Sequence, residues 1–158
     1  MLSKVYIETT IPSFYYNTRK APEHVARMNW TRLWWKTCRP LYDVCSSLAV
    51  LDELNRREHP LKLQKMALLK DVTLLKITPE VIKVVEVYIA RKVMPTDPVG
   101  DALHLALASH HKCDILLSWN CNHIANVQKY DHVRKVNTQL GLHVPLLVTP
   151  LEFLTDQK

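Results

Sequence analysis

Short apolar runs alternate with longer helical segments along the whole sequence, and this alternation restricts the fold more than any other feature. The apolar runs predict strands at residues 5–7, 41–45, 72–77, 114–118 and 146–148. Periodicity and start signals predict helices at residues 23–37, 48–57, 60–70, 78–92, 97–111 and 131–140. Strands that alternate with helices form parallel sheets with both faces covered. We therefore expect an α/β fold, a three-layer α/β/α sandwich around a parallel sheet of about five strands.

The chain length predicts one domain over residues 1–158, because the sequence contains no linker, repeat or low-complexity stretch. A chain of this size, 47% apolar, can bury a substantial core, hiding roughly 70% of its unfolded surface. Its two glycines are Gly100 and Gly141, so neither a G-x-G-x-x-G motif nor a Walker A loop can be written. Glycine-rich nucleotide-binding loops are therefore excluded.

The N-terminal sequence and the cysteines predict a cytoplasmic protein with no membrane partner. Glu8 lies where the apolar core of a signal peptide would run, and no apolar stretch approaches the roughly 18 residues that span a bilayer. The four cysteines form no C-x-x-C pair, and reduced thiols are expected for all of them. These are Cys38, Cys45, Cys113 and Cys121.

The positive charge is concentrated at the N-terminal end of the chain. The formal net charge is +6, and residues 1–40, with seven basic and two acidic side chains, contribute +5 of it. A net charge alone is weak evidence for a polyanionic partner. A local excess is more informative, because it places the region where such a partner would bind.

Four polar residues fall near the carboxyl ends of predicted strands, where ligands bind in open parallel sheets. Glu8 closes the first strand, Glu53 lies in the helix after the second, and Asn120 follows the fourth. Asp101 lies in the apolar helix before the fourth strand, and Asp97 before Pro98 already serves as the expected cap of that helix. We therefore expect Asp101 to be buried among apolar neighbours, which costs several kcal/mol unless a partner compensates it.

Each of these residues also has an ordinary structural interpretation. Glu8 could be a solvated strand end, and Asp52 and Glu53 could lie on the outer face of an amphipathic helix. Because neighbouring helical residues point about 100° apart, at most one of Asp52 and Glu53 is expected to face inward. His104 shares the face of Asp101 at i+3 and is expected to be a structural histidine with an inward hydrogen bond. Convergent carboxylates would favour a divalent cation such as Mg²⁺ or Mn²⁺, which takes oxygen ligands.

Three segments resemble the PIN-domain family, which includes the VapC-type toxins of bacterial toxin–antitoxin pairs. They are VYIETTIPSFYYNTR, SSLAVLDELNRREHP and DALHLALASHHKCDILLSWNCNHIAN. The resemblance covers almost the whole chain. It implies an α/β/α sandwich with its acids gathered at one edge of the sheet. It also implies a Mg²⁺- or Mn²⁺-dependent ribonuclease that leaves a 5′-phosphate and a 3′-hydroxyl.

The resemblance assigns catalytic roles to Glu8, Glu53, Asp101 and Asn120, with the three acids as metal ligands. Glu8 stands where most members of the family have an aspartate, and Asn120 replaces the fourth acid. The site would carry three formal negative charges instead of four, so weaker cation binding is expected and a second metal is less favoured. Asn120 and Ser118 are expected to orient the attacking water or the scissile phosphate.

The helix predicted at residues 23–37 mixes basic and aromatic side chains. It carries Arg27, Arg32 and Lys36 together with Trp30, Trp34 and Trp35. Single-stranded RNA stacks on aromatic rings while cations hold its phosphates. We expect the three cations to supply RNA affinity and the tryptophans to supply packing in the core or against a partner. The resemblance adds a homodimer and an antitoxin protein as expected partners.

Two alternatives remain open from the sequence. A zinc site built from the histidines and cysteines of residues 110–123 is disfavoured, because their spacing fits no closed zinc pattern. Its candidates are His110, His111, Cys113, Cys121 and His123. The second alternative is a catalytically weakened or inactive PIN-fold module that binds RNA or protein. Retention of three acids favours the enzyme, since a decayed site should lose its costly buried acid first.

Overall fold

The computed structural model describes residues 2–93, 100–120 and 127–155, and its centre is a five-stranded parallel sheet. The strands lie in the order β3-β2-β1-β4-β5. Their bounds are β1 Lys4–Ile7, β2 Asp43–Ser47, β3 Thr73–Leu75, β4 Ile115–Leu117 and β5 Leu146–Val148. The predicted number of strands and their parallel arrangement are confirmed. β2 lies two residues later than predicted, because Arg39–Leu41 form a 3₁₀ turn before it.

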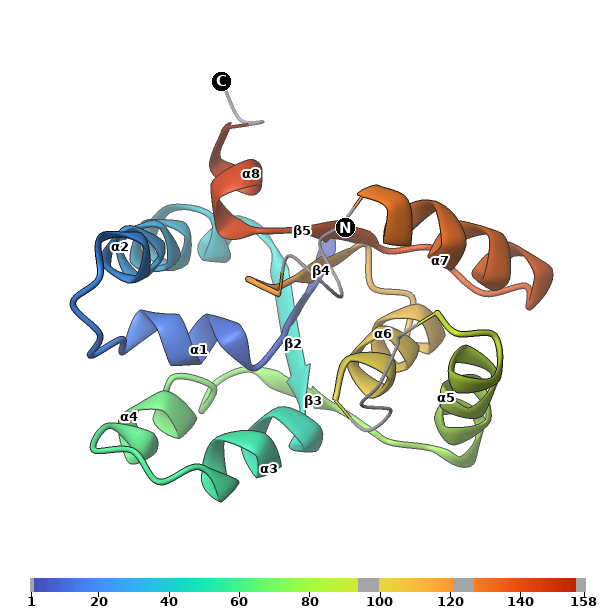
Figure 1. Ribbon diagram of the computed structural model, residues 1–158, viewed down its shortest axis with the longest axis horizontal. Coiled ribbons are helices and arrows are strands. Elements are labelled where there is room, and N and C mark those ends of the chain that lie inside the picture. Colours follow the sequence, from blue (N-terminus) through green and yellow to red (C-terminus); the bar gives the residue numbers. More distant parts are fainter. Residues whose placement is uncertain (1, 94–99, 121–126, 156–158) are drawn as a thin grey trace.

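Helices cover the sheet and complete the predicted three-layer α/β/α sandwich. Figure 1 shows α1, α2 and α8 on one side of the strands and α5, α6 and α7 on the other. The helices are α1 Thr10–Tyr15, α2 Pro22–Thr37, α3 Leu48–Arg56, α4 Lys62–Ala67, α5 Pro79–Ala90, α6 Asp101–His110, α7 Val127–Gln139 and α8 Pro150–Thr155. α2 packs on both α1 and α8, and α5 packs on α6. No helix of the described ranges is both long enough and apolar enough to cross a membrane.

The strand order places a topological switch point beside β1. The chain passes from β1 to β2 and β3 on one side, and later adds β4 and β5 on the other side. In register, Tyr6 of β1 lies opposite Cys45 of β2 and Leu116 of β4. Ligands of open α/β sheets bind beyond the carboxyl ends of the strands at such a point. The residues that follow β1 and β4 therefore lie where a functional site is expected.

The core lies on both faces of β1 and β4. Tyr6, Trp34, Leu105 and Leu116 are fully buried, and together they join the sheet to α2 and α6. The core also contains the hydroxyl of Tyr88, which donates to Oδ1 of Asn137. Because both faces of the sheet are covered, β4 and β5 are continuous apolar runs, whereas β2 ends in the buried Ser46 and Ser47.

The structure differs from the predictions at the start of the chain, at α6 and at the end of the described region. The short helix α1 was not predicted, and Pro12 lies in its first turn, where the missing N–H has no intrahelical partner to lose. The short helix α8 was not predicted. The predicted cap at Asp97-Pro98 lies outside the described residues, and α6 as described begins at Asp101.

Candidate functional site

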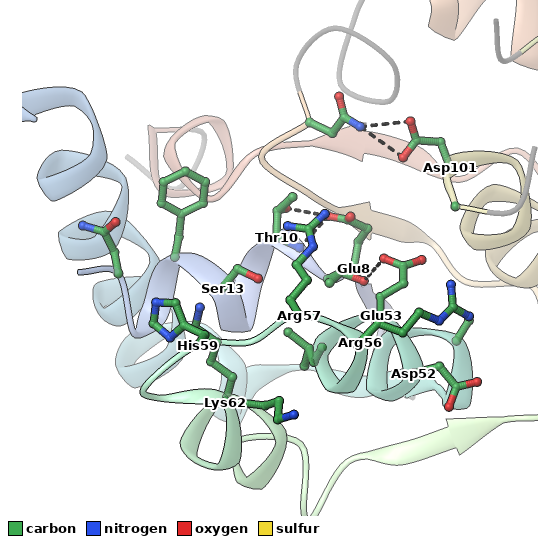
Figure 2. Close-up of a pocket in the computed structure, with 18 of the residues that line it drawn as sticks. Glu8, Thr10, Ser13, Asp52, Glu53, Arg56, Arg57, His59, Lys62 and Asp101 are labelled. Carbon is green, nitrogen blue, oxygen red and sulfur yellow. Dashed lines mark hydrogen bonds between the residues drawn. The ribbon is translucent and has the colours of Figure 1, made fainter. Parts of the chain in front are cut away.

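A cleft of about 820 Å³ opens at the carboxyl edge of the sheet, and the three predicted acids line it together with Asp52 and Glu58 (Figure 2). Glu8 follows β1, Glu53 lies on α3 and Asp101 is the first residue of α6. Asn120, two residues after β4, lines the same cleft. The four residues that sequence reasoning placed in one site therefore share one cleft.

Glu8 is the most deeply buried of the three acids, with 4% of its surface exposed. Its Oε2 accepts hydrogen bonds from the backbone N–H of Thr10 at 3.0 Å, from the Thr10 hydroxyl, and from the Ser118 hydroxyl at 2.8 Å. Burial raises the pKa of Glu8 above its ordinary value, although His104 and these hydrogen bonds oppose the shift. No hydrogen bond from the described part of the chain reaches Oε1. That oxygen is the one left for a ligand.

The ends of β1 and β4 are tied together around Glu8. The Glu8 backbone N–H donates to the Leu117 carbonyl at 3.2 Å, which extends the pairing of the two strands by one residue. Thr10 Oγ1 accepts from the Trp119 backbone N–H at 2.8 Å, and Ser118 Oγ accepts from the Asn120 backbone N–H at 2.9 Å. These bonds fix the carboxylate of Glu8 relative to both strand ends.

Glu53 is held by a buried chain of hydrogen bonds. Its Oε1 lies 2.8 Å from His104 Nε2, and its Oε2 accepts from the Thr9 hydroxyl at 2.6 Å. His104 Nδ1 lies 2.7 Å from the Tyr6 hydroxyl, which lies 2.7 Å from Ser47 Oγ. His104 is fully buried, and the structure places the expected inward hydrogen bonds on both of its ring nitrogens.

The pair of Glu53 and His104 favours its charged form. Desolvation by burial opposes this, but the hydrogen bond and charge of His104 lower the pKa of Glu53 overall. For His104, desolvation lowers the pKa, yet Glu53 and Glu8 raise it above the ordinary value overall. The imidazolium would therefore offset part of the repulsion between Glu8 and Glu53 when no cation is bound.

Asp101 does not have the expected burial. It was predicted to lie inside an apolar helix, but it is half-buried and occupies the first turn of α6 after Gly100. A negative charge at a helix N-terminus is favourable, so the position is less costly than an interior one. Asn120 Nδ2 donates to both carboxylate oxygens of Asp101, at 3.0 Å each (Figure 2). The costly buried acid is Glu8.

The donor set fits a hard divalent cation. Ligand atoms of Glu8, Glu53 and His104 lie within 4.8 Å of one another. A Cβ placed on Gly100 would lie 3.9 Å from Glu53 Oε1, so the start of α6 also lies close to the Glu53 carboxylate. His104 has both nitrogens in hydrogen bonds, which leaves carboxylate oxygens as the natural ligands. Oxygen ligands suit Mg²⁺ and Mn²⁺.

Ser118 and the cations of α2 do not line the cleft. Ser118 is fully buried behind Glu8 and does not line the cleft, so its described role is to hold Glu8. Arg27, Arg32 and Lys36 do not line the cleft either. The Arg27 guanidinium lies 5.5 Å from the ring centre of Phe14, and Arg32 donates to the Tyr15 carbonyl at 2.8 Å. Lys36 is exposed.

Two tryptophans of α2 pack as expected. Trp34 is fully buried and meets Phe153 edge to face, with ring centres 5.6 Å apart. Trp30 stacks on Trp119 with ring centres 6.1 Å apart. Aromatic pairs of this kind stabilise a core by about 0.5–1.5 kcal/mol beyond their area burial. These two rings are engaged with the protein itself.

Sequence reasoning missed the basic wall of the cleft. Among the residues that the structure describes, five lysines and arginines line it, all from the α1–α2 loop or from the end of α3 through α4: Arg19, Arg56, Arg57, Lys62 and Lys65. A signal was present, because Arg56 and Arg57 follow Glu53 at i+3 and i+4 and so share its helix face. Figure 2 shows Arg57 reaching from the end of α3 into the space beside the acids.

The zinc alternative gains no support within the described ranges. The carboxylate–histidine group around Glu53 is the only cluster found there with three candidate ligands, and neither His110 nor His111 belongs to it. Cys113 is buried with its Sγ 3.6 Å from that of Cys45, and both are free thiols. Cys121 and His123 lie outside the described residues.

Comparison with known proteins leaves the family assignment at the level of resemblance. No protein-family model matches the chain, and no curated protein matches it either.

Proposed function

We propose that the chain is a ribonuclease that hydrolyses phosphodiester bonds of RNA with Mg²⁺ or Mn²⁺ as its cofactor. One observation carries the proposal: Glu8, buried and hydrogen-bonded on one oxygen only, points its carboxylate at Glu53 in a cleft that Asp101 also lines. A buried carboxylate is costly to keep charged, and the neighbouring His104 compensates only part of the charge of Glu8 and Glu53. The composition of the site therefore supports a bound cation.

Glu8, Glu53 and Asp101 are the residues that would hold the ion. The ion would supply positive charge to the phosphoryl oxygens as negative charge develops on them, and would favour ionisation of the attacking water. Thr10 and Ser118 fix the carboxylate of Glu8, and Thr9 and His104 fix that of Glu53. Asn120, whose Nδ2 donates to both oxygens of Asp101, would orient the attacking water or the scissile phosphate.

A cleavage assay tests the proposal. Wild-type protein and Asp101→Asn are incubated with end-labelled single-stranded RNA while Mn²⁺ is titrated. We expect wild-type cleavage that depends on the metal, with 5′-phosphate and 3′-hydroxyl product ends. Removing one ligand charge should abolish cleavage in the variant while its melting temperature stays close to that of wild type, because Asp101 is only half-buried. Full activity of Asp101→Asn would refute the assignment.

The proposal includes the biological setting that the family resemblance implies. The protein would act in the cytoplasm as the toxin of a toxin–antitoxin pair, form a homodimer and bind an antitoxin protein. Light scattering on the purified protein tests the dimer, with about twice the mass of 18.4 kDa expected. A mass equal to one chain at micromolar concentration would contradict it.

A second candidate is a catalytically weakened module that binds RNA or protein. The observation in its favour is Asn120, which replaces an acid and donates to both oxygens of Asp101. In this case the protein would bind RNA without cleaving it at any Mn²⁺ concentration. The cleavage assay, run beside a binding measurement, separates the two candidates.

A further inference from the structure

Lys65 has a buried stem, and its ammonium group has no protein partner among the described residues. Lys65 is 9% exposed, it lines the cleft, and within the described part of the chain no hydrogen bond or ion pair reaches its ammonium group. The ammonium group itself keeps contact with solvent in the cleft, as the charged ends of long cationic side chains commonly do. The nearby Lys62 shows the contrast, since its ammonium donates to the Asn55 carbonyl at 3.1 Å.

The charges that act on the pKa of Lys65 are of the same sign. Burial lowers the pKa of Lys65, and the positive charges of Arg57 and Arg19 lower it further. The same cations are available to a ligand, since among the described residues neither guanidinium has a hydrogen bond or ion pair. Three cations without a hydrogen bond or ion pair among the described residues create a positive local potential in this cleft.

The backbone that carries these cations is held in place. His59 Nδ1 accepts from the Leu61 backbone N–H at 3.0 Å, so the proton of the neutral ring lies on Nε2. Nε2 then donates to the Thr18 hydroxyl at 3.2 Å. Burial and the charge of Lys65 lower the pKa of His59, which favours this neutral form. The bond ties the loop of Arg19 to the turn between α3 and α4, so the backbone segments that carry Arg19 and Lys65 are joined beside the cleft.

We propose that Arg19, Arg57 and Lys65 bind a phosphate group of the RNA strand other than the one that is cleaved. Three donors of this kind match a phosphate, which offers several acceptor oxygens and binds arginine through two parallel bonds. The position shares its cleft with Glu8, Glu53 and Asp101 but includes none of them. A strand whose scissile phosphate lies at the acids carries further phosphates along the cleft. Contacts to such phosphates set the register of the strand without reading its sequence.

This inference rests on the proposed function for the identity of the strand, but the cation cluster can be tested without it. Lys65→Met keeps the apolar stem and removes the charge, and Lys70→Met is the matched control at an exposed lysine that does not line the cleft. In metal-free buffer, we expect inorganic phosphate to raise the melting temperature of wild type and Lys70→Met, but not of Lys65→Met. Without phosphate, Lys65→Met should melt at or above the wild-type temperature, because an uncompensated charge is gone. An equal phosphate effect in all three proteins would overturn the site.

A second experiment measures RNA binding. Affinity for a labelled single-stranded RNA is measured against salt in the Asp101→Asn background, with Lys65→Met, Arg57→Gln or Lys70→Met added. We expect about a tenfold loss for Lys65→Met and Arg57→Gln, and a salt slope smaller by about 0.7 for each lost phosphate contact. Affinities equal to that of the Lys70→Met control would overturn the inference. A phosphate effect without metal-dependent RNA cleavage by wild type would refute the ribonuclease and retain the phosphate position.

Discussion

Glu8 follows β1 and is buried in the protein. Its surroundings show which features of the site could be predicted from single residues of the sequence. That Glu8, Glu53, Asp101 and Asn120 gather in one cleft could be predicted, because the carboxyl ends of parallel strands lie at one edge. Their burial could not be predicted. It depends on where α6 begins and on which hydroxyl groups approach from other elements, such as that of Ser118, 110 residues away in sequence.

Glu8→Gln should show separately how much the buried charge lowers stability and whether that charge binds the metal ion. In metal-free buffer we expect a melting temperature equal to or above that of wild type, because the amide carries no charge to desolvate. Mg²⁺ should then stabilise wild type but not the variant. Differential scanning fluorimetry with and without Mg²⁺ measures both effects. A variant that Mg²⁺ stabilises as strongly as wild type would show that Glu8 is not a ligand.

His104→Phe should destabilise the protein and misplace Glu53. The ring keeps the volume, but Glu53 and the buried Tyr6 hydroxyl each lose a partner, which costs about 1–3 kcal/mol of unfolding free energy. Chemical denaturation measures the loss, and His110→Phe, at the last residue of the same helix, is the control with a near-neutral effect expected. Equal stability of wild type and His104→Phe would contradict the supporting role of the buried chain.

At the scale of elements, α5, α6 and α7 are joined by one buried polar cluster. The Tyr88 hydroxyl of α5 donates to Asn137 Oδ1 of α7 and lies 3.2 Å from Ser109 Oγ of α6. Asn137 Nδ2 donates to Ser109 Oγ at 2.9 Å. Periodicity predicted the helices that carry these residues. It could not predict the cluster, because the three positions become neighbours only when the helices pack.

The cluster makes stability depend on pH in the alkaline range. Burial raises the pKa of Tyr88 from 10.0 to about 12. The unfolded chain therefore loses this proton first, so the stability contributed by Tyr88 is complete below pH 10 and is lost as the pH rises toward 12. Tyr88→Phe should be less stable at neutral pH by about 1–3 kcal/mol, since it leaves Asn137 with an unmet acceptor.

Denaturation of wild type and Tyr88→Phe at pH 8 and above pH 10 checks this prediction. The gap in unfolding free energy between the two proteins should narrow as the pH rises, because only wild type titrates at this position. A gap that stays constant would contradict the assigned shift.

The cations of α2 remain predicted RNA contacts, now placed outside the cleft. Changing Arg27, Arg32 and Lys36 together to Ala should lower RNA affinity and its salt dependence, since long-range attraction to the backbone is lost. It should also lower stability by about 0.5–1 kcal/mol for each arginine that lies over an aromatic ring. Anisotropy titrations across a salt series measure the first effect and thermal melting the second. Unchanged affinity and salt slope would exclude α2 from the RNA path.

At the scale of the whole molecule, the strand order decides where the chemistry is. Alternating periodicity predicts a parallel sheet, but the order β3-β2-β1-β4-β5 is set by pairings between distant segments, which periodicity does not contain. That order brings the residues after β1 beside those after β4. The same packing turns the basic residues of the α3–α4 region toward the acids, although the charge distribution along the sequence pointed to residues 1–40.

Binding of Mg²⁺ or Mn²⁺ should raise the free energy of unfolding of the whole protein. At a Mg²⁺ or Mn²⁺ concentration of about one hundred times its dissociation constant, the folded state gains about 2.7 kcal/mol. For a chain of this size that corresponds to a rise in melting temperature of about 5–10 °C. A monovalent salt of equal ionic strength is the control. The same rise with both salts would show general screening instead of a site.

The most direct test of the metal-dependent ribonuclease is cleavage of labelled single-stranded RNA by three matched proteins in Mn²⁺. They are wild type, Asp101→Asn, and Asp52→Asn, which removes an equal charge from an exposed acid of the same cleft. We expect wild type and Asp52→Asn to cut at similar rates and to stop when the metal is chelated, while Asp101→Asn does not cut. Equal cleavage by Asp101→Asn and Asp52→Asn, or cleavage that survives chelation, would contradict the proposed metal site.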